Sequence, residues 1–246
     1  TKEFWDEFEG NYEDTVISIF ENKNELVKLI NKIPDKNKKI LGDFGSGVGK
    51  AIPYLLEFKK IYQIDFSENM LSKAKEKYSK HKNIQFILGT NENTKLNEKL
   101  DIIIAINSIF PLKHEDFDST LENFIENTHK DAEIILVLAS FEFKTFRYHL
   151  EADFLFSKNQ NPLEIRKYFF EKQREENFNP FGYFISLNKI VQKQWLKEEI
   201  FFRLKKFHFK SVKIQKLKLT WNYKQLKNPS FNNYPNPWYW LVKIKK

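Results

Sequence analysis

The sequence predicts an α/β protein with a doubly wound, mostly parallel sheet of seven strands. Apolar segments of strand length alternate with segments of helical period through the first 140 residues, which is the order that a parallel sheet with crossover helices requires. The strand segments are continuous apolar runs such as "LDIIIAI", residues 100–106, and such runs are typical of strands covered on both faces. We therefore expect helices on both sides of the sheet.

The elements follow in order from this alternation. Apolar residues at helical spacing predict helices over 15–31, 49–58, 67–80, 117–130 and 195–207, with Ser67 as N-cap of the third. The expected strands cover 39–44, 61–65, 84–88, 100–106, 133–140, 211–221 and 238–245. In the sixth strand the apolar residues change from even positions, as at Ile214, to odd positions, as at Leu217, which predicts a β-bulge.

The alternation stops between residues 141 and 194, where aromatic and charged residues are dense. We therefore expect a core made of residues 1–140 and 195–246, with residues 141–194 inserted as a cap. The aromatic side chains of this segment could line a binding pocket, as ligand pockets usually are lined, or they could form the cap's own core. Both interpretations stay open at this point.

The composition excludes several classes of site. The chain has no cysteine, which removes disulfides, thiolate zinc sites, iron–sulfur clusters and thiolate nucleophiles, and fits a reducing compartment. Its apolar runs, such as residues 102–106, are far short of the roughly 18 residues that suggest a membrane span. No signal-peptide pattern is present at Thr1. We expect a cytoplasmic protein with no membrane partner.

The positive charge of the chain has two interpretations. The formal net charge is +8, but nearly all the cations are lysines mixed with Asp and Glu, which favours an ordinary solvated surface. Residues 202–218 are the exception, because they form a dense basic stretch. A nucleic-acid site on this stretch is therefore the alternative to a purely solvated surface.

The segment "ILGDFGSGVGK", residues 40–50, contains four of the seven glycines of the chain. It departs from two nucleotide-binding patterns. A P-loop needs four residues between its first glycine and the Gly-Lys pair and a hydroxyl after the lysine, but three residues follow Gly45 and the next position is Ala51. The dinucleotide pattern GxGxxG needs a glycine at position 50, which is Lys50. The segment instead has an acid at a strand end followed by alternate glycines.

That pattern, "DFGSGVG", resembles motif I of the class I S-adenosylmethionine-dependent methyltransferases, and the order of elements through residue 246 agrees with this family. The resemblance implies a Rossmann-like sheet whose last strand is antiparallel, S-adenosylmethionine as cofactor, S-adenosylhomocysteine as product and no metal ion. Glycine allows positive φ and close approach of the backbone to a ligand. The resemblance implies that the cofactor's methionyl part is bound by Asp43, Gly45, Ser46, Gly47 and Gly49.

Two later strand ends match the same family. Asp65 follows Asp43 by 22 residues, near the ~20 expected of consecutive strands, where relatives carry an acid that binds the ribose hydroxyls. "LDIIIAINSIF" resembles motif IV, in which Asp101 opens the strand and its carboxyl edge, where open α/β sheets bind ligands, carries two polar residues. The resemblance implies further cofactor contacts at Phe66, Met70, Asn107 and Ser108. Relatives commonly have an acid after the third strand that reaches the adenine amino group. This chain departs from that pattern, because Thr90 and Asn91 occupy the place of the acid, and the resemblance implies that these two residues lie beside the adenine.

The N-terminal segment "EFWDEFEGNYEDTV" is similar to the lid of small-molecule methyltransferases. This implies a helical lid over residues 1–38, in which Tyr12 contacts the cofactor and Trp5 the substrate. Methyl transfer from a sulfonium is an in-line displacement that depends on alignment and requires no base unless the acceptor must lose a proton. Candidate bases are His114, Glu142 and His149, and further candidate substrate contacts are Phe110, Arg147, Phe181 and Tyr183.

The acceptor can be narrowed by exclusion. "NSIF", residues 107–110, lacks the Asn/Asp-Pro-Pro-aromatic motif of nucleic-acid amino-methyltransferases and the acidic pair of polyamine synthases. The absence of cysteine excludes cytosine C5 chemistry. We therefore expect a small-molecule acceptor and a monomer or homodimer. Two alternatives stay open: an RNA methyltransferase that uses residues 202–218, and a non-catalytic regulatory module that binds the cofactor.

Overall fold

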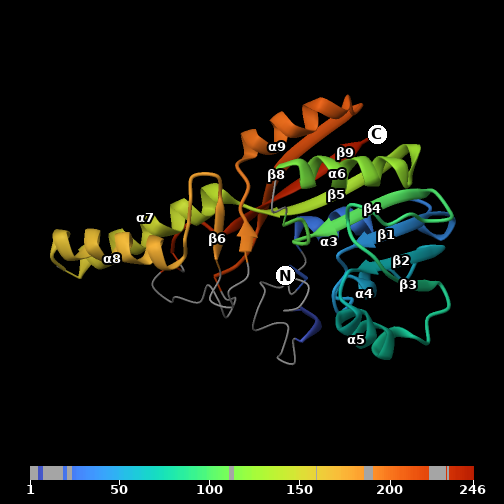
Figure 1. The fold of residues 1–246 in the computed structure, drawn as a ribbon, viewed down its shortest axis with the longest axis horizontal. Coiled ribbons are helices and arrows are strands. Elements are labelled where there is room, and N and C mark those ends of the chain that lie inside the picture. Colours follow the sequence, from blue (N-terminus) through green and yellow to red (C-terminus); the bar gives the residue numbers. More distant parts are fainter. Residues whose placement is uncertain are drawn as a thin grey trace.

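The structure is a computed structural model that describes residues 5–7, 19–20, 24–110, 114–158, 160–185, 191–221, 231 and 233–246. Within these residues seven strands form one sheet in the order β3-β2-β1-β4-β5-β9-β8 (Figure 1). The bounds of these strands are β1 (Ile40–Phe44), β2 (Lys60–Asp65), β3 (Ile84–Leu88), β4 (Leu100–Ile106), β5 (Thr128–Ala139), β8 (Ser211–Lys218) and β9 (Trp238–Lys245). The first five pair in parallel, and β9 runs antiparallel to β5 and β8. The predicted seven-stranded sheet with an antiparallel last strand is confirmed.

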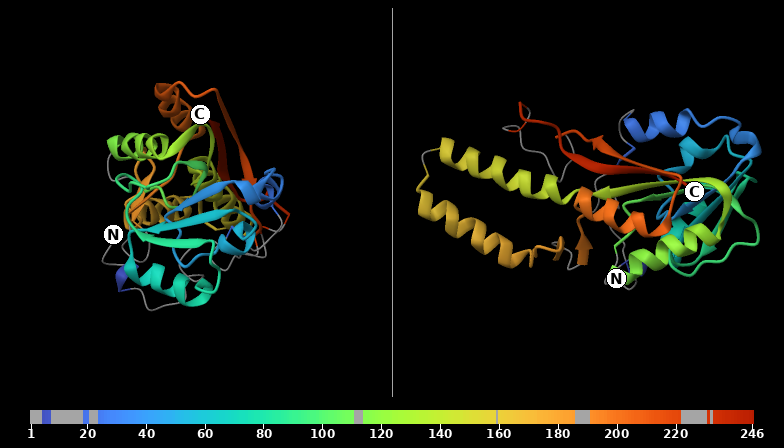
Figure 2. Two further views of the ribbon diagram at one scale, coloured as in Figure 1. Left: turned by 90° about the vertical axis from the view of Figure 1, so that its right-hand side faces the viewer. Right: turned by 90° about the horizontal axis from the view of Figure 1, so that it is seen from above.

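Helices cover both faces of this sheet. They are α3 (Glu25–Asn31), α4 (Ile52–Leu55), α5 (Glu68–Tyr78), α6 (His114–Glu126) and α9 (Lys197–Leu204), with short 3-10 turns η1 (Lys36–Lys38) and η2 (Lys205–Phe207). Figure 2 shows α3 on one side of the sheet and α6 and α9 on the other. The predicted cap of α5 is confirmed, because the Ser67 side chain accepts a hydrogen bond from the Met70 backbone N–H.

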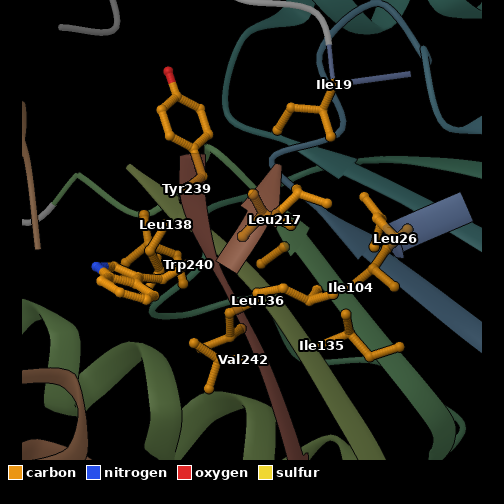
Figure 3. Packing of buried hydrophobic residues seen from close by; sticks show 14 of the residues in the cluster. Ile19, Leu26, Ile104, Ile135, Leu136, Leu138, Leu217, Tyr239, Trp240 and Val242 are labelled. Carbon is orange, nitrogen blue, oxygen red and sulfur yellow. The ribbon is translucent and has the colours of Figure 1, made fainter. Parts of the chain in front are cut away.

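The core lies on the two faces of the central strands (Figure 3). Ile104 and Ile135 are cross-strand partners and lie toward Leu26 of α3, and all three are fully buried. Leu136 and Val242 are cross-strand partners on the opposite face and are equally buried. Burial on both faces explains why these strands are continuous apolar runs in the sequence.

Three helix predictions were wrong at their boundaries. The helix expected over 15–31 corresponds to α3, which begins only at Glu25, because Ile19 and Phe20 lie in a bend and Asn24 caps the helix. The helix expected over 49–58 is reduced to the four residues of α4, with turns on either side. Gly49 has a φ of 76° and so cannot belong to a right-handed helix. The helix expected over 117–130 begins at His114 and ends at Glu126, because the chain from Thr128 onward already pairs with β4.

The β-bulge expected in β8 was also wrong. The pairing of β8 with β9 runs from Ser211 opposite Lys245 to Lys218 opposite Trp238 without a shift in register. The change in apolar parity has another cause, since β8 is the edge strand and its two halves are covered on different faces. Leu217 lies opposite Tyr239 on the face of the sheet that packs on α3, whereas Ile214 lies opposite Val242 on the other face, which α9 covers (Figure 3).

Residues 141–193, here called the α7–β7 segment, follow β5 and stand apart from the main sheet. They comprise α7 (Phe141–Ser157), α8 (Pro162–Glu175) and a separate two-stranded sheet of β6 (Tyr183–Ile185) and β7 (Val191–Lys193). Figures 1 and 2 show α7 and α8 as an antiparallel pair that projects away from the body of the molecule. Ser140 and Trp195 form a parallel bridge, so the two ends of the segment meet at one root.

Candidate functional site

The glycine-rich loop after β1 has the backbone conformation that its sequence predicts. Gly45, Gly47 and Gly49 have φ values of 71°, 54° and 76°, which residues with a side chain rarely adopt. The Gly45 and Ser46 N–H groups both donate to the Ile64 carbonyl, at 2.7 and 2.9 Å, and so join the loop to β2. A Cβ on Gly45 would overlap the side chain of Ser108. The loop thus lies where the sheet order reverses between β1 and β4, the usual ligand position in open α/β sheets.

Asp65 closes β2 beside this loop. Its Oδ2 accepts a hydrogen bond from the Gly47 N–H at 2.7 Å, and its Oδ1 accepts one from the Ser67 N–H at 2.9 Å. Burial raises the pKa of Asp65, and the hydrogen bonds from Ser67, Gly47 and Phe66 oppose that rise. The carboxylate is therefore held in one orientation by both the glycine loop and the first turn of α5.

Asp43 is almost fully buried in β1, and its cross-strand partner in β2 is Gln63. The Gln63 Nε2 donates to Asp43 Oδ2 at 3.1 Å. The pKa of Asp43 is raised to about 7: burial and the negative charge of Asp65 raise it, and the hydrogen bond from Gln63 partly opposes that rise. The charged form of Asp43 is thus a buried carboxylate in need of a positively charged partner.

The carboxyl end of β4 completes this edge. Asn107 has a φ of 50°, and its buried Oδ1 has no hydrogen-bond partner among the described residues. The Ser108 hydroxyl donates to the Phe44 carbonyl at 2.7 Å, and the Ser108 carbonyl accepts from the Asn91 side chain at 2.9 Å. Ser108 therefore connects the carboxyl ends of β4 and β1 with the loop after β3. Asp101 lies at the other end of β4, where it accepts a hydrogen bond from the Ile40 N–H at 2.8 Å.

The loop after β3 is held by amide side chains. The Asn91 carbonyl accepts a hydrogen bond from Asn123 of α6 at 2.9 Å, and the Thr90 carbonyl accepts one from the Thr94 hydroxyl at 2.7 Å. The Thr90 side chain is exposed and that of Asn91 is partly buried. On the other side of Asp65, Met70 is buried and Phe66 is half-buried.

The short described part of the N-terminal segment lies beside α5. The Trp5 carbonyl accepts a hydrogen bond from the Asn69 side chain at 3.4 Å, and the charge of Asp6 raises the pKa of Asp65. The segment therefore passes close to the second acid of the site. Tyr12, the predicted cofactor contact of this segment, lies outside the described residues.

Glu142 stands at the root of the α7–β7 segment with both carboxylate oxygens engaged. Its Oε1 accepts from the Lys197 N–H at 2.8 Å, and its Oε2 accepts from the Trp240 indole at 3.0 Å and from the Ser140 hydroxyl at 3.1 Å. These contacts tie α7 to α9 and β9. They favour a structural role for Glu142 over the predicted catalytic one.

The other candidates for acceptor chemistry are dispersed. His149 is exposed on α7, and His114 is the first residue of α6, with a side chain outside the described set. Phe110, just before the undescribed residues 111–113, is 38% exposed, and Phe181 is 64% exposed. Arg147 lies half-buried on α7, and Tyr183 lies half-buried in β6.

The aromatic side chains of the α7–β7 segment pack mostly on one another and on the core. Phe178 contacts Phe141, Tyr148 and Phe184, and Phe143 contacts Trp238 of β9. Charged groups lie among these rings: Lys144 pairs with Glu176 at 2.5 Å and Lys172 pairs with Glu151 at 2.6 Å. Packing within the segment or against the main core thus accounts for most of its aromatic residues, without a pocket.

The sheet has the strand order expected of the class I S-adenosylmethionine-dependent methyltransferases. At the point where this order reverses lie the other expected features: an acid, a glycine loop at positive φ and a second acid. Residues 42–131 match the family model described as a methyltransferase domain, and the sheet has the fold of this class. No curated protein matches the chain significantly.

Solved structures share the fold at low sequence identity. A Listeria monocytogenes protein assigned as an S-adenosylmethionine-dependent methyltransferase is 18% identical, with a TM-score of 0.60, and the match covers 90% of this chain and 95% of that one. Magnesium protoporphyrin IX methyltransferase from Synechocystis PCC 6803 with bound S-adenosylmethionine is 13% identical, with a TM-score of 0.55 and coverage of 90% and 76%. A Burkholderia thailandensis 1,6-didemethyltoxoflavin-N1-methyltransferase, with its acceptor and S-adenosylhomocysteine, is 11% identical, with a TM-score of 0.53 and coverage of 85% and 71%.

The residues at the carboxyl edge fit S-adenosylmethionine, the cofactor of this class. The glycine loop holds three residues at positive φ, Asp43 is a buried acid with a raised pKa, and Asn107 has a buried acceptor without a described partner. The buried hydroxyl of Ser46 likewise has no partner among the described residues. Within the described residues no group of three or more His, Cys, Asp and Glu side chains could hold a metal ion. No helix of the described part is long and apolar enough to cross a membrane.

The sequence analysis missed Gln63. Its signal was a single amide in the apolar run "IYQID", at the register position opposite Asp43. A polar residue inside a strand that is otherwise buried on both faces needs a hydrogen-bond partner, and the partner here is a predicted site residue.

Proposed function

We propose that the protein transfers the methyl group of S-adenosylmethionine to a small-molecule acceptor held between the glycine-rich edge of the sheet and the α7–β7 segment. One observation carries this proposal: the segment leaves the sheet at the carboxyl end of β5, the same edge that presents the glycine loop. Asn107, at the end of β4, donates its N–H to the Val137 carbonyl of β5, three residues before the root at Ser140.

In this proposal the cofactor supplies an activated methyl group on a sulfonium, and the chain supplies binding and alignment. Ionised Asp43 binds the ammonium group, and the loop from Gly45 to Gly49 lies against the methionyl part. Asp65, held by the Gly47 and Ser67 N–H groups, accepts from the ribose hydroxyls through its remaining lone pairs. Alignment of acceptor, methyl and sulfur in a site closed to water then contributes most of the acceleration.

Arg147 is the proposed contact for a polar or anionic end of the acceptor. It lies on the face of α7 that carries Lys144 and Glu151, and its guanidinium makes no ion pair with any described residue. Tyr183 of β6 is the proposed second contact. Burial raises the pKa of Tyr183, so its hydroxyl stays protonated at neutral pH and can donate a hydrogen bond to the acceptor.

The RNA alternative receives less support from the arrangement of the basic stretch. Lys213 lies opposite Lys243 on one face of the sheet, whereas Lys216 lies on the other face, over the Trp238 ring at 3.6 Å. Lys206 and Lys210 are paired with Asp118 and Asp131. The lysines of residues 202–218 thus do not form one continuous surface for a polyanion.

Calorimetry with S-adenosylmethionine, followed by a methyl-release assay against a panel of small metabolites, tests the proposal. We expect binding with a 1:1 stoichiometry and turnover that requires one class of acceptor. Binding without turnover on any member of the panel would favour the non-catalytic module. No binding of the cofactor or of S-adenosylhomocysteine would overturn the assignment of the site.

A further inference from the structure

Gln63 is a fully buried amide in the middle of β2, next to a carboxylate that has no cationic partner. Its side chain is 0% exposed, and it donates one hydrogen bond, from Nε2 to Asp43 Oδ2 at 3.1 Å. Its Oε1 is buried and has no hydrogen-bond partner among the described residues. A buried polar atom of this kind costs free energy unless a ligand or a water satisfies it.

The charged groups that act on the Gln63–Asp43 pair are negative. Asp65 lies close enough for its charge to raise the pKa of Asp43, and Asp6 acts on Asp65 in the same way. No Lys, Arg or His of the described residues forms an ion pair with Asp43. The pair therefore offers hydrogen-bond acceptors and negative charge, and what it lacks is a positively charged donor.

We propose that Gln63 is a positioning residue for cofactor binding: its Nε2 orients the Asp43 carboxylate, and its Oε1 gives the cofactor's ammonium group a second acceptor, directly or through one water. This inference rests on the proposed function, because it assigns a role to Gln63 within that site. An ammonium group suits the pair chemically, since it brings three N–H donors and one positive charge to the unpartnered Oε1 of Gln63 and to the Asp43 carboxylate.

The role has a consequence for pH. The ammonium group binds the ionised form of Asp43, so cofactor affinity should fall as the pH drops below about 7, where Asp43 takes up a proton. The hydrogen bond from Gln63 favours the ionised form of Asp43. Removing that bond should therefore move the loss of affinity to higher pH, which a purely structural role in packing would not do.

The test compares the wild type with Gln63→Met, which keeps the length of the side chain and removes the amide. The ligands are S-adenosylhomocysteine and 5′-methylthioadenosine, a nucleoside without the ammonium group. We expect Gln63→Met to weaken S-adenosylhomocysteine roughly tenfold at pH 7, as for a lost hydrogen bond to a charged group. The pH midpoint of its binding should rise, and the affinity for 5′-methylthioadenosine should stay unchanged.

A matched control is Tyr62→Phe, which removes a side-chain hydrogen bond of the same strand, to Glu98 at 2.9 Å, away from Asp43. It should bind both nucleosides like the wild type. Gln63→Leu replaces Gln63→Met if the latter does not fold, as judged by thermal unfolding at pH 6. An unchanged affinity and pH midpoint for S-adenosylhomocysteine in a folded variant would refute the role of Gln63 alone. A wild type that binds neither nucleoside would instead refute the proposed function.

Discussion

In the proposed site, ionised Asp43 lowers the stability of the ligand-free protein and supplies the negative charge that binds the cofactor. Its pKa is raised from 3.8 to about 7, chiefly by burial, so the folded state holds the proton more tightly than the unfolded state does. Its contribution to stability is therefore largest at low pH and is lost as the pH rises from about 4 to about 7. Each unit of pKa shift corresponds to about 1.4 kcal/mol, so ionised Asp43 costs the ligand-free protein several kcal/mol.

Replacing Asp43 with Asn should stabilise the ligand-free protein above pH 7 and abolish cofactor binding. The amide has the shape of the carboxylate without its charge, so the cost of burying an ion disappears together with the partner for the ammonium group. Thermal unfolding from pH 5 to pH 8 measures the first effect, which should vanish toward pH 4, and calorimetry measures the second.

Asp101→Asn is the control for this prediction, because Asp101 lies at the opposite end of β4 and bonds the Ile40 N–H. It should leave cofactor binding intact. Retention of wild-type affinity in Asp43→Asn would contradict the assignment of Asp43 to the ammonium group.

At the scale of elements, the α7–β7 segment is anchored firmly at its root and extends freely at its tip. The Trp195 carbonyl accepts hydrogen bonds from the Phe141 N–H at 3.0 Å and from the Trp240 indole at 3.1 Å, and Glu142 adds its contacts to α9. Toward the tip, Phe156 and Leu163 are 47% and 71% exposed, and Ile165 is the one buried residue of α8. Removal of the outer part of α7 and α8 therefore costs few core contacts, chiefly the ring contact of Phe154 with Phe231.

Joining Leu150 to Gln173 through a short glycine–serine loop should leave a folded protein that binds cofactor and has lost turnover. The shortened chain keeps Phe143 on Trp238 and the pair of Lys144 with Glu176, so the root stays intact. Calorimetry with S-adenosylhomocysteine and the methyl-release assay measure the two properties separately. Turnover at the wild-type rate would show that the outer hairpin takes no part in the reaction.

At the scale of the whole molecule, the net charge of +8 is spread over separate surfaces. Lys213, Lys243 and Lys245 lie on one face of β8 and β9, and Lys243 is paired with Glu133 of β5. Exposed lysines along β8 also protect the free edge of the sheet against pairing with another chain. Solubility and edge protection account for the basic stretch without a nucleic-acid partner.

The double variant Lys213→Gln, Lys216→Gln should leave methyl transfer to a small acceptor unchanged, because both lysines lie on the edge strand β8, which β4, β5 and β9 separate from the strand before the glycine loop. RNA binding of the wild type, followed by filter binding at 50 to 200 mM salt, should be weak and equal in the variant. A steep fall of affinity with salt, reduced in the variant, would support the RNA alternative, since each phosphate contact contributes a slope of about −0.9 for duplexes.

Much of the fold could be predicted because its signals are local. The apolar runs of β1 to β5, the Ser67 cap and the positive φ of the glycine loop all follow from residues that are near one another in the chain. The predictions failed where contacts between segments that are distant in the chain determine the structure. The parity of β8 depends on α9 and α3 covering its two faces, and the end of α6 depends on β4 taking up the chain from Thr128 onward.

The sequence by itself determined the class of sheet, the glycine loop and the two acids beside it, because strand periodicity and glycine geometry are properties of short segments. Only the tertiary structure decided that Gln63 lies on Asp43, that Glu142 serves the root of the α7–β7 segment, and that Ser108 joins the ends of β4 and β1 to the loop after β3. The physical reason is that the role of a polar side chain depends on the partner it meets across the fold, and cross-strand register and packing choose that partner.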